Sequence, residues 1–501
     1  MSPLHTPRQR WLLLATVSVG LLMITMDNSI LYTALPTLTS DLGASTTQGL
    51  WIINAYPLVM AGLLLGSGTL GDRFGHRRLF LVGLVIFGAA SLLAAFSPNP
   101  ATLIAARAVL AVGAACMMPA TLALIRLSFD DVRERNLAIG VWGSVAVIGM
   151  AGGPIVGGIL LEHFWWGSVF LINVPVVIAA LIAIPMVASP SPVDRSRRWD
   201  WTSSVWALLT LTGAVLAVKE LAHLPPSWPM LTASLAMTLL FGFLFVRRQR
   251  RLTHPLLDFS LFGNAAFSTG VATAALSMFA VGGLEMATTQ RFQLVAGYSP
   301  LQAGLVVTAV ALGSLPTSLL SGALLHILGL RIIVGSGFAV GTIGMACALA
   351  GAHHRATWLL VTGLVVAGAG LGATMSVAST AIIGNAPPNR AGMASSVEEV
   401  SYEFGGLFAI AVLGSLLSAI YSATIQPPPT APSAVRESIT AAHATGDPTI
   451  IAIAATAFDG AYATVLGIIT VVLTIATLVT TVTLRHYGIG SRASRWETND
   501  H

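Results

Sequence analysis

Acidic side chains lie inside long apolar stretches of this sequence, where a charged group is energetically costly and is therefore expected to have a function. The acids in question are Asp27, Glu285, Glu398, Glu399 and Glu403. A charged side chain at the centre of a bilayer costs about 2.5–3.5 kcal/mol on insertion scales. Only one basic residue, Arg107, lies equally deep in such a stretch, so it can neutralise one or two acids. The others either form structural ion pairs, stay protonated because apolar surroundings disfavour the charge, or bind a cation.

Three of these acids share one face of a predicted helix with a phenol and a hydroxyl group. At about 100° per residue, the polar side chains of this segment fall within an arc of roughly 140°. They are Ser395, Glu398, Glu399, Tyr402 and Glu403, and the opposite face carries Val, Leu and Ile. Such an arc must face protein or a water-filled cavity rather than lipid.

The composition shows which solvent surrounds the elements that position these residues. The chain has 501 residues, is 55% hydrophobic and only 9% charged, and has a mean hydropathy of +0.81. Soluble domains carry roughly 25% charged residues, so lipid must surround most of this chain. Two cysteines exclude a disulfide-rich secreted protein. The net charge of +5 sits in short clusters between apolar runs, which argues against a nucleic-acid partner.

Apolar runs of about 20 residues predict transmembrane helices. Fourteen runs are found, grouped as six, two and six, at about 11–35, 50–71, 79–97, 101–125, 137–161, 168–188, 203–221, 229–246, 265–290, 301–325, 331–352, 357–384, 392–421 and 458–484. We therefore expect an all-α polytopic membrane protein. A six-helix bundle at 1–190 and another at 264–501 are joined by a linker with two extra helices at 191–263. The longest loop, 422–457, is expected outside.

The distribution of arginine predicts the orientation. If the N-terminus lies inside, most arginines fall in inner segments, as the positive-inside rule requires. The basic residues that fall in outer segments are Lys219, Arg291, Arg355 and Arg436. Both termini are then cytoplasmic, and the alternation supports the count of fourteen spans.

Two further patterns are built from glycine. The segment Gly68–Arg78 joins the second and third spans and combines glycines with Asp72 and a basic cluster, so it predicts a conformational latch, or else only a topology signal. The fifth span repeats Gly149, Gly153 and Gly157 every four residues, beside Pro154 and Gly158. This stripe lets another helix approach closely.

Signatures of other chemistries are absent from the sequence. The only lysine is Lys219 and no phosphate-binding loop occurs, so ATP is not the expected energy source. No converging nucleophile or metal cluster is found, which argues against a membrane enzyme. Glu162–His163 lacks the second histidine of a zinc helix.

These patterns together resemble the major facilitator superfamily, in particular its fourteen-helix drug:proton antiporter branch and the quaternary-ammonium pumps within it. Gly68–Arg78 is similar to the loop signature, with His76 and Arg77 where Arg and Lys are usual. Arg107–Gly113 resembles the fourth-span motif, although Ala111 and Val112 alter the usual glutamine position. The further segments that carry the resemblance are Asp27–Pro36, Gly149–Gly158, Trp166 and Phe170–Pro175.

The resemblance implies two six-helix bundles that expose a central cavity alternately to each side of the membrane. It implies a proton-coupled multidrug efflux antiporter for lipophilic and quaternary-ammonium cations such as dyes, antiseptics and biguanides. Protons and membrane lipids would be its other partners. A monomer in the bacterial cytoplasmic membrane is expected, with the proton gradient in place of a cofactor and with no metal. A lipid or metabolite exporter of the same fold, or a non-transporting membrane sensor, remains as an alternative.

Roles for individual residues follow from both arguments. We expect substrate binding by Asp27, Glu285, Tyr56 and Tyr402. Proton coupling is expected at Asp27, Glu398, Glu399, Glu403 and Arg107, with the role of Glu399 open. Gating or helix packing is expected at Gly68, Asp72, Arg73, Gly75, Arg77, Gly149, Gly153, Pro154, Gly157 and Gly158.

Overall fold

The described part of the protein is built of helices and contains no strand. A computed structural model describes residues 7–129, 131–189, 193, 199–222, 226–252, 255–387 and 391–487. A few side chains inside these ranges, that of Asp72 among them, lie outside the description. The chain divides into two compact units, Met1–Leu208 and Leu209–His501. Each unit is described by itself.

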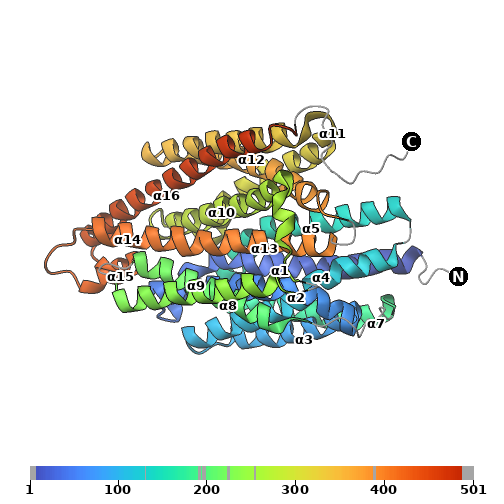
Figure 1. The fold of residues 1–501 in the computed structure, drawn as a ribbon. Helices are drawn as coiled ribbons and strands as arrows, with labels where there is room; N and C mark the ends of the chain where they lie inside the picture. Colours follow the sequence, from blue (N-terminus) through green and yellow to red (C-terminus); the bar gives the residue numbers. More distant parts are fainter. Residues whose placement is uncertain are drawn as a thin grey trace. The chain divides into compact units, whose positions relative to one another are not determined.

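Seven helices form most of the first unit (Figure 1). They are α1 (Pro7–Asp41), α2 (Thr46–Phe74), α3 (His76–Ala95), α4 (Pro100–Ser128), α5 (Val132–His163), the short α6 (Ser168–Leu171) and α7 (Asn173–Val187). An eighth, α8 (Trp201–Ala222), begins in this unit and ends in the second. The predicted sixth span corresponds to α6 and α7 together.

Local sequence signals explain where several of these helices begin. Ser45 and Gln48 form a reciprocal capping box at the start of α2. The side chain of Asn99 accepts from the backbone N–H of Thr102 and precedes Pro100 in the first turn of α4. Both arrangements satisfy backbone N–H groups that have no partner within the helix, which matters most where no water is available.

The second unit contains the remaining long helices and several short ones. They are α9 (Trp228–Gln249), η1 (Phe259–Gly263), α10 (Ala265–Leu294), α11 (Pro300–His353), α12 (Thr357–Ile383), α13 (Ala391–Ala409), the π-helical η3 (Ile410–Gly414), α14 (Ser415–Thr424), η4 (Ser433–Arg436), α15 (Ile439–Ala444) and α16 (Pro448–Thr483). The π-turn η3 joins α13 and α14 into one span, Met393–Thr424. The outer loop predicted at 422–457 contains η4, α15 and the start of α16.

The helix α11 contains two spans rather than one. Its 54 residues are interrupted at Gly329, whose φ of 76° and ψ of 163° are not helical. The segment before Gly329 runs parallel to α12, since Val310 lies against Gly368 and Ser314 against Gly372. The segment after it runs antiparallel to α12, since Gly344 lies against Ala367 and Gly351 against Leu360. The chain therefore turns back at Gly329, and Figure 1 labels α11 and α12 next to each other.

This turn reconciles the predicted and observed numbers of spans. Within the described residues, 13 helices are long and apolar enough to cross a membrane. Counting α11 as two spans gives the fourteen that the apolar runs predict.

Large apolar side chains cover the outside of both units. Met186 on α7 is 73% exposed and Leu239 on α9 is 72% exposed. Water would make such surfaces unfavourable, whereas lipid tails accommodate them. Together with the number of long apolar helices, these surfaces identify a multi-pass membrane protein.

Candidate functional site

A fully buried ion pair joins α1 and α4 in the first unit. Nη1 of Arg107 lies 2.5 Å from Oδ2 of Asp27. The side chains are 0% and 1% exposed, respectively. The sequence left open whether Asp27 attracts a cation or belongs to a structural ion pair, and in this conformation its charge is balanced by Arg107.

Three further elements of this unit complete the surroundings of the pair. Nδ2 of Asn173, the first residue of α7, donates to Oδ1 of Asp27 at 2.8 Å and to Oγ of Ser91 on α3 at 3.3 Å. On α2, the carbonyl oxygen of Ile52 accepts from Nε of Arg107 at 3.3 Å. The ring of Tyr56 lies 4.5 Å below the guanidinium carbon, which is cation–π geometry.

The contacts of Asn173 were not predicted from the sequence. Its position in Phe170–Pro175 was part of the family resemblance, but no role was assigned to it. Because α6 ends at Leu171 and α7 begins at Asn173, this side chain enters the core at a helix start. A polar residue directly before an apolar helix is a weak signal, and only the fold shows what it touches.

The glycine stripe of α5 lies against the segment of α1 that carries Asp27. A Cβ on Gly149 would lie 2.0 Å from Oγ1 of Thr25, and one on Gly153 would lie 2.3 Å from Oγ of Ser29. Oγ of Ser29 donates to the carbonyl oxygen of Met150 at 2.6 Å. Only glycine permits this approach, so α5 fixes the position of α1 on both sides of Asp27.

The rest of the α5 motif follows the same pattern. A Cβ on Gly157 would lie 3.2 Å from Cγ2 of Ile30, a tight contact rather than an overlap. Pro154 lies inside the helix, and both Pro154 and Gly158 are buried.

The predicted gating segment is mostly helical. Gly68 to Phe74 form the last turns of α2, and a single residue, Gly75 with a φ of 91°, connects α2 to α3. Nη2 of Arg77 donates to the carbonyl oxygen of Pro185 on α7 at 3.1 Å, and the guanidinium of Arg73 lies 5.4 Å from the ring of Phe74. No side-chain contact of Asp72 can be described, so the latch hypothesis remains a prediction.

In the second unit, Glu285 on α10 is 9% exposed and lacks a counter-ion among the described residues. No hydrogen bond joins its carboxyl group to another described residue. It lies two residues after Gly283, where a Cβ would be 2.2 Å from Cδ1 of Leu413. Glu285 is therefore a nearly buried carboxyl group for which the described residues supply no counter-ion.

The polar face of α13 lies partly against α12. Oγ of Ser379 donates to Oε2 of Glu398 at 3.2 Å, and the hydroxyl of Tyr402 donates to the carbonyl oxygen of Met375 at 3.3 Å. The next turn packs on α10, because a Cβ on Gly405 would lie 2.1 Å from the carbonyl oxygen of Ala275. Glu398, Glu399, Tyr402 and Glu403 are all half-buried. Of the three carboxyl groups on this helix, that of Glu398 therefore faces α12.

One ion pair of this unit was not predicted. Nε of Arg291 on α10 donates to Oδ1 of Asp459 on α16 at 2.8 Å. The guanidinium also lies 5.5 Å from the ring of Tyr462, whose hydroxyl is hydrogen-bonded to Thr288 at 3.1 Å. The sequence places Arg291 and Asp459 separately near the outer ends of their spans, and 168 residues separate them.

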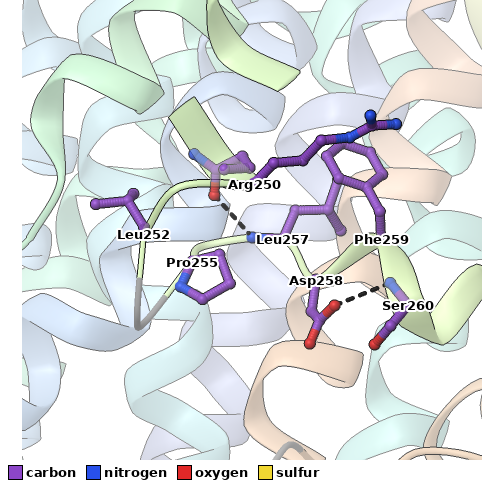
Figure 2. A pocket seen from close by; sticks show the side chains of 8 residues that line it. Arg250, Leu252, Pro255, Leu257, Asp258, Phe259 and Ser260 are labelled. Carbon is purple, nitrogen blue, oxygen red and sulfur yellow. Dashed lines mark hydrogen bonds between the residues drawn. The ribbon is translucent and has the colours of Figure 1, made fainter. Parts of the chain in front are cut away.

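A surface pocket of about 350 Å³ lies at the junction of α9 and η1 (Figure 2). Oε1 of Gln249 accepts from the backbone N–H of Leu257 at 3.2 Å, and Oδ1 of Asp258 accepts from that of Ser260 at 2.8 Å. No predicted site residue lines this pocket. Among the described residues, no group of three His, Cys, Asp or Glu is arranged to hold a metal ion.

Comparison with known proteins identifies the relatives of this chain. The model of the Major Facilitator Superfamily matches residues 17–291 and 265–428. The multidrug efflux pump LfrA of Mycolicibacterium smegmatis is 37% identical, over 85% of this chain and 84% of the relative. The methyl viologen resistance protein SmvA of Salmonella typhimurium is 38% identical, over 84% and 85%. The multidrug resistance protein Stp of Mycobacterium tuberculosis is 31% identical, over 84% and 78%.

Solved structures show the same fold. A bacterial homologue of the human lysosomal transporter Spinster, in an inward-facing and occupied conformation, aligns with a TM-score of 0.68 at 15% identity. The alignment covers 96% of this chain and 98% of the other. At this identity the similarity concerns the fold alone.

Proposed function

The chain belongs to the major facilitator superfamily, and on that basis we propose that it is a proton-coupled multidrug efflux antiporter. It exports lipophilic and quaternary-ammonium cations, including dyes, antiseptics and biguanides, by alternating access. Relatives named for multidrug efflux and methyl viologen resistance support this proposal. The proton gradient supplies the energy, and no cofactor takes part.

The observation that carries the proposal is the imbalance of buried charge. Arg107 forms an ion pair with Asp27, and both residues lie in the first unit. Among the described residues of the second unit, no ion pair joins Glu285, Glu398 or Glu399 to a basic side chain. Carboxyl groups in such surroundings suit a transporter that binds either a proton or an organic cation. The same excess disfavours anionic substrates.

Different acids are assigned different parts of the cycle. Glu285 attracts the cation in the conformation described above, because no described basic residue forms an ion pair with its carboxyl group. Asp27 meets a cation only when its contact with Arg107 loosens, and Arg107 tunes the charge of Asp27. Glu398 and Glu403 couple transport to protons, with Glu399 as a further candidate.

Aromatic residues are assigned the remaining part of substrate recognition. Tyr402 stands on the same helical face as Glu398 and offers a flat surface to the cation. The ring of Tyr56 packs against the guanidinium of Arg107. This ring becomes available to a substrate only when the guanidinium moves away.

The direction of transport follows from where protons bind and leave. Protonation from outside neutralises the acids and releases the drug, and deprotonation toward the cytoplasm restores the site. Exchange of more than one proton for a monovalent cation also uses the membrane potential, which is worth about 2.3 kcal/mol per charge per 100 mV. We place the protein as a monomer in the bacterial cytoplasmic membrane, surrounded by lipid, with both termini inside.

Ethidium transport in proteoliposomes with an imposed pH gradient tests the proposal. The wild type is compared with Asp27→Asn, and ethidium exchange without a gradient is measured in parallel. Gradient-driven movement that is lost in the variant supports a proton-coupled cation exporter with Asp27 at its site. A wild type that binds ethidium without moving it along the gradient contradicts the proposal, and favours a lipid or metabolite carrier or a sensor.

A further inference from the structure

The amide of Asn173 makes a contact with Asp27 that depends on the protonation state of the acid. Nδ2 of Asn173 donates to Oδ1 of Asp27 at 2.8 Å and to Oγ of Ser91 at 3.3 Å. Asn173 is 1% exposed, and its Oδ1 has no hydrogen-bond partner in the described structure. This geometry fits a charged carboxylate, which can only accept hydrogen bonds.

A protonated Asp27 needs the opposite partner. The proton binds Oδ1 in preference to Oδ2, because Oδ2 faces the guanidinium of Arg107. The new O–H group is a donor, and it would then point at the N–H₂ group of Asn173, which is also a donor. In a dry core, a buried donor without an acceptor costs about 1–3 kcal/mol.

Both neighbours of Asp27 on this side can reverse their hydrogen bonds. The oxygen and nitrogen of an asparagine amide are nearly equal in size, so rotation by 180° exchanges acceptor and donor without changing the packing. The hydroxyl of Ser91 accepts in the present arrangement and can donate after rotation. After such a flip, Oδ1 of Asn173 accepts from both the Asp27 carboxyl group and Ser91, while Nδ2 takes the former position of Oδ1, where the described structure offers no acceptor.

We propose that Asn173 is a positioning residue that stabilises both protonation states of Asp27 by rotation of its amide. The inference rests on the proposed function, because it requires that Asp27 exchanges protons. The only covalent change is the O–H bond that forms at Oδ1 of Asp27 and later breaks when the proton leaves to water. Asn173 and Ser91 exchange hydrogen bonds and neither gains nor loses a proton overall.

Few other groups near Asp27 carry charge. Among the described residues, α4 contributes Arg107 and α2 contributes Tyr56, whose ring supports the guanidinium. The contacts from α3 and α7 come from Ser91 and Asn173. On the α5 side, the carbonyl oxygen of Met150 and the glycines meet α1. Arg107 and Asn173 therefore control the protonation of Asp27 from opposite carboxyl oxygens.

Infrared difference spectroscopy of the purified protein tests this proposal without relying on transport. The C=O stretching band that appears on acidification and is absent in Asp27→Asn reports protonated Asp27. In Asn173→Leu, whose side chain has the same branched shape with methyl groups in place of the amide oxygen and nitrogen, we expect the band to move to higher wavenumber because its hydrogen bond is lost.

A matched variant controls for the loss of a buried amide. Asn54→Leu makes the same change at a fully buried asparagine of the same unit, whose amide has no hydrogen-bond partner among the described residues. It should leave the Asp27 band in place. If Asn173→Leu does not fold, the smaller Asn173→Ala serves the same purpose.

Three results would overturn the proposal: no Asp27 band at any pH, a band that Asn173→Leu leaves unmoved, or an equal shift in Asn54→Leu. The proposed function fails separately, if the wild type shows no gradient-driven ethidium transport. If the band behaves as expected but the protein does not transport ethidium, the role of Asn173 is supported and the antiporter function is contradicted.

Discussion

Arg107 and Asp27 form their ion pair where neither side chain reaches solvent, with Nη1 of the arginine 2.5 Å from Oδ2 of the aspartate. The two residues are 80 positions apart and belong to α4 and α1. Such a pair adds little net stability, because desolvation offsets the attraction, but breaking it leaves a buried charge. Removing either partner would therefore leave the other without charge compensation in the core of the unit.

The first prediction concerns the stability of this pair. Asp27→Asn should destabilise the protein by about 3–5 kcal/mol, because arginine cannot lose its charge when its partner is removed. Arg107→Met should cost less, since Asp27 can take up a proton. The double variant should recover part of the loss. Thermal unfolding in detergent measures this order, and a double variant less stable than Asp27→Asn would contradict it.

The second prediction concerns Glu285 as a charge site for substrate. Glu285→Gln should reduce export of the divalent cation methyl viologen more than export of monovalent ethidium, because a dication gains more from a second carboxylate. Glu437→Gln, at an exposed position of the loop 422–457, is the control and should change neither. Equal loss of both substrates would exclude this role for Glu285.

The third prediction concerns the approach of α5 to α1. Gly153→Ala should reduce transport and stability together, because the new Cβ would lie 2.3 Å from Oγ of Ser29 and 3.0 Å from the backbone nitrogen of Ile30. Gly152→Ala is the matched control, since its Cβ would meet nothing within 4 Å. Alanine also favours a helix by about 1 kcal/mol over glycine, so the control variant Gly152→Ala should be at least as stable as the wild type. Similar losses in both variants would refute the packing argument.

The fourth prediction separates proton coupling from substrate binding on α13. Glu398→Gln and Glu403→Gln should lose ethidium transport driven by a pH gradient but keep ethidium exchange across a membrane without a gradient. The amide cannot exchange a proton, yet it preserves the shape of the site. Proteoliposomes loaded with ethidium allow both measurements. Gradient-driven transport at the wild-type rate in both variants would show that coupling lies elsewhere.

The sequence by itself determined the fold class and the family, and it predicted a number of spans with which the structure is consistent. Composition requires lipid as solvent, and apolar runs of the length of a bilayer can satisfy their backbone only as helices. The fourteen predicted spans correspond to the observed helices, including the pair inside α11, because Gly329 and the following Arg331 already divide two apolar runs. The glycine spacing of the fifth span likewise predicted a close helix contact, which α1 provides.

Only the tertiary structure decided which polar groups meet. The sequence offered Arg107 several possible partners, and the fold selected Asp27. It also added Asn173 and Ser91 to this site, and it joined Arg291 to Asp459. The physical reason is that hydropathy records how deep a side chain lies in the membrane, whereas a partner depends on how each helix is rotated and packed. That rotation is set by many contacts along the whole helix, such as those between α5 and α1, and no local pattern contains it.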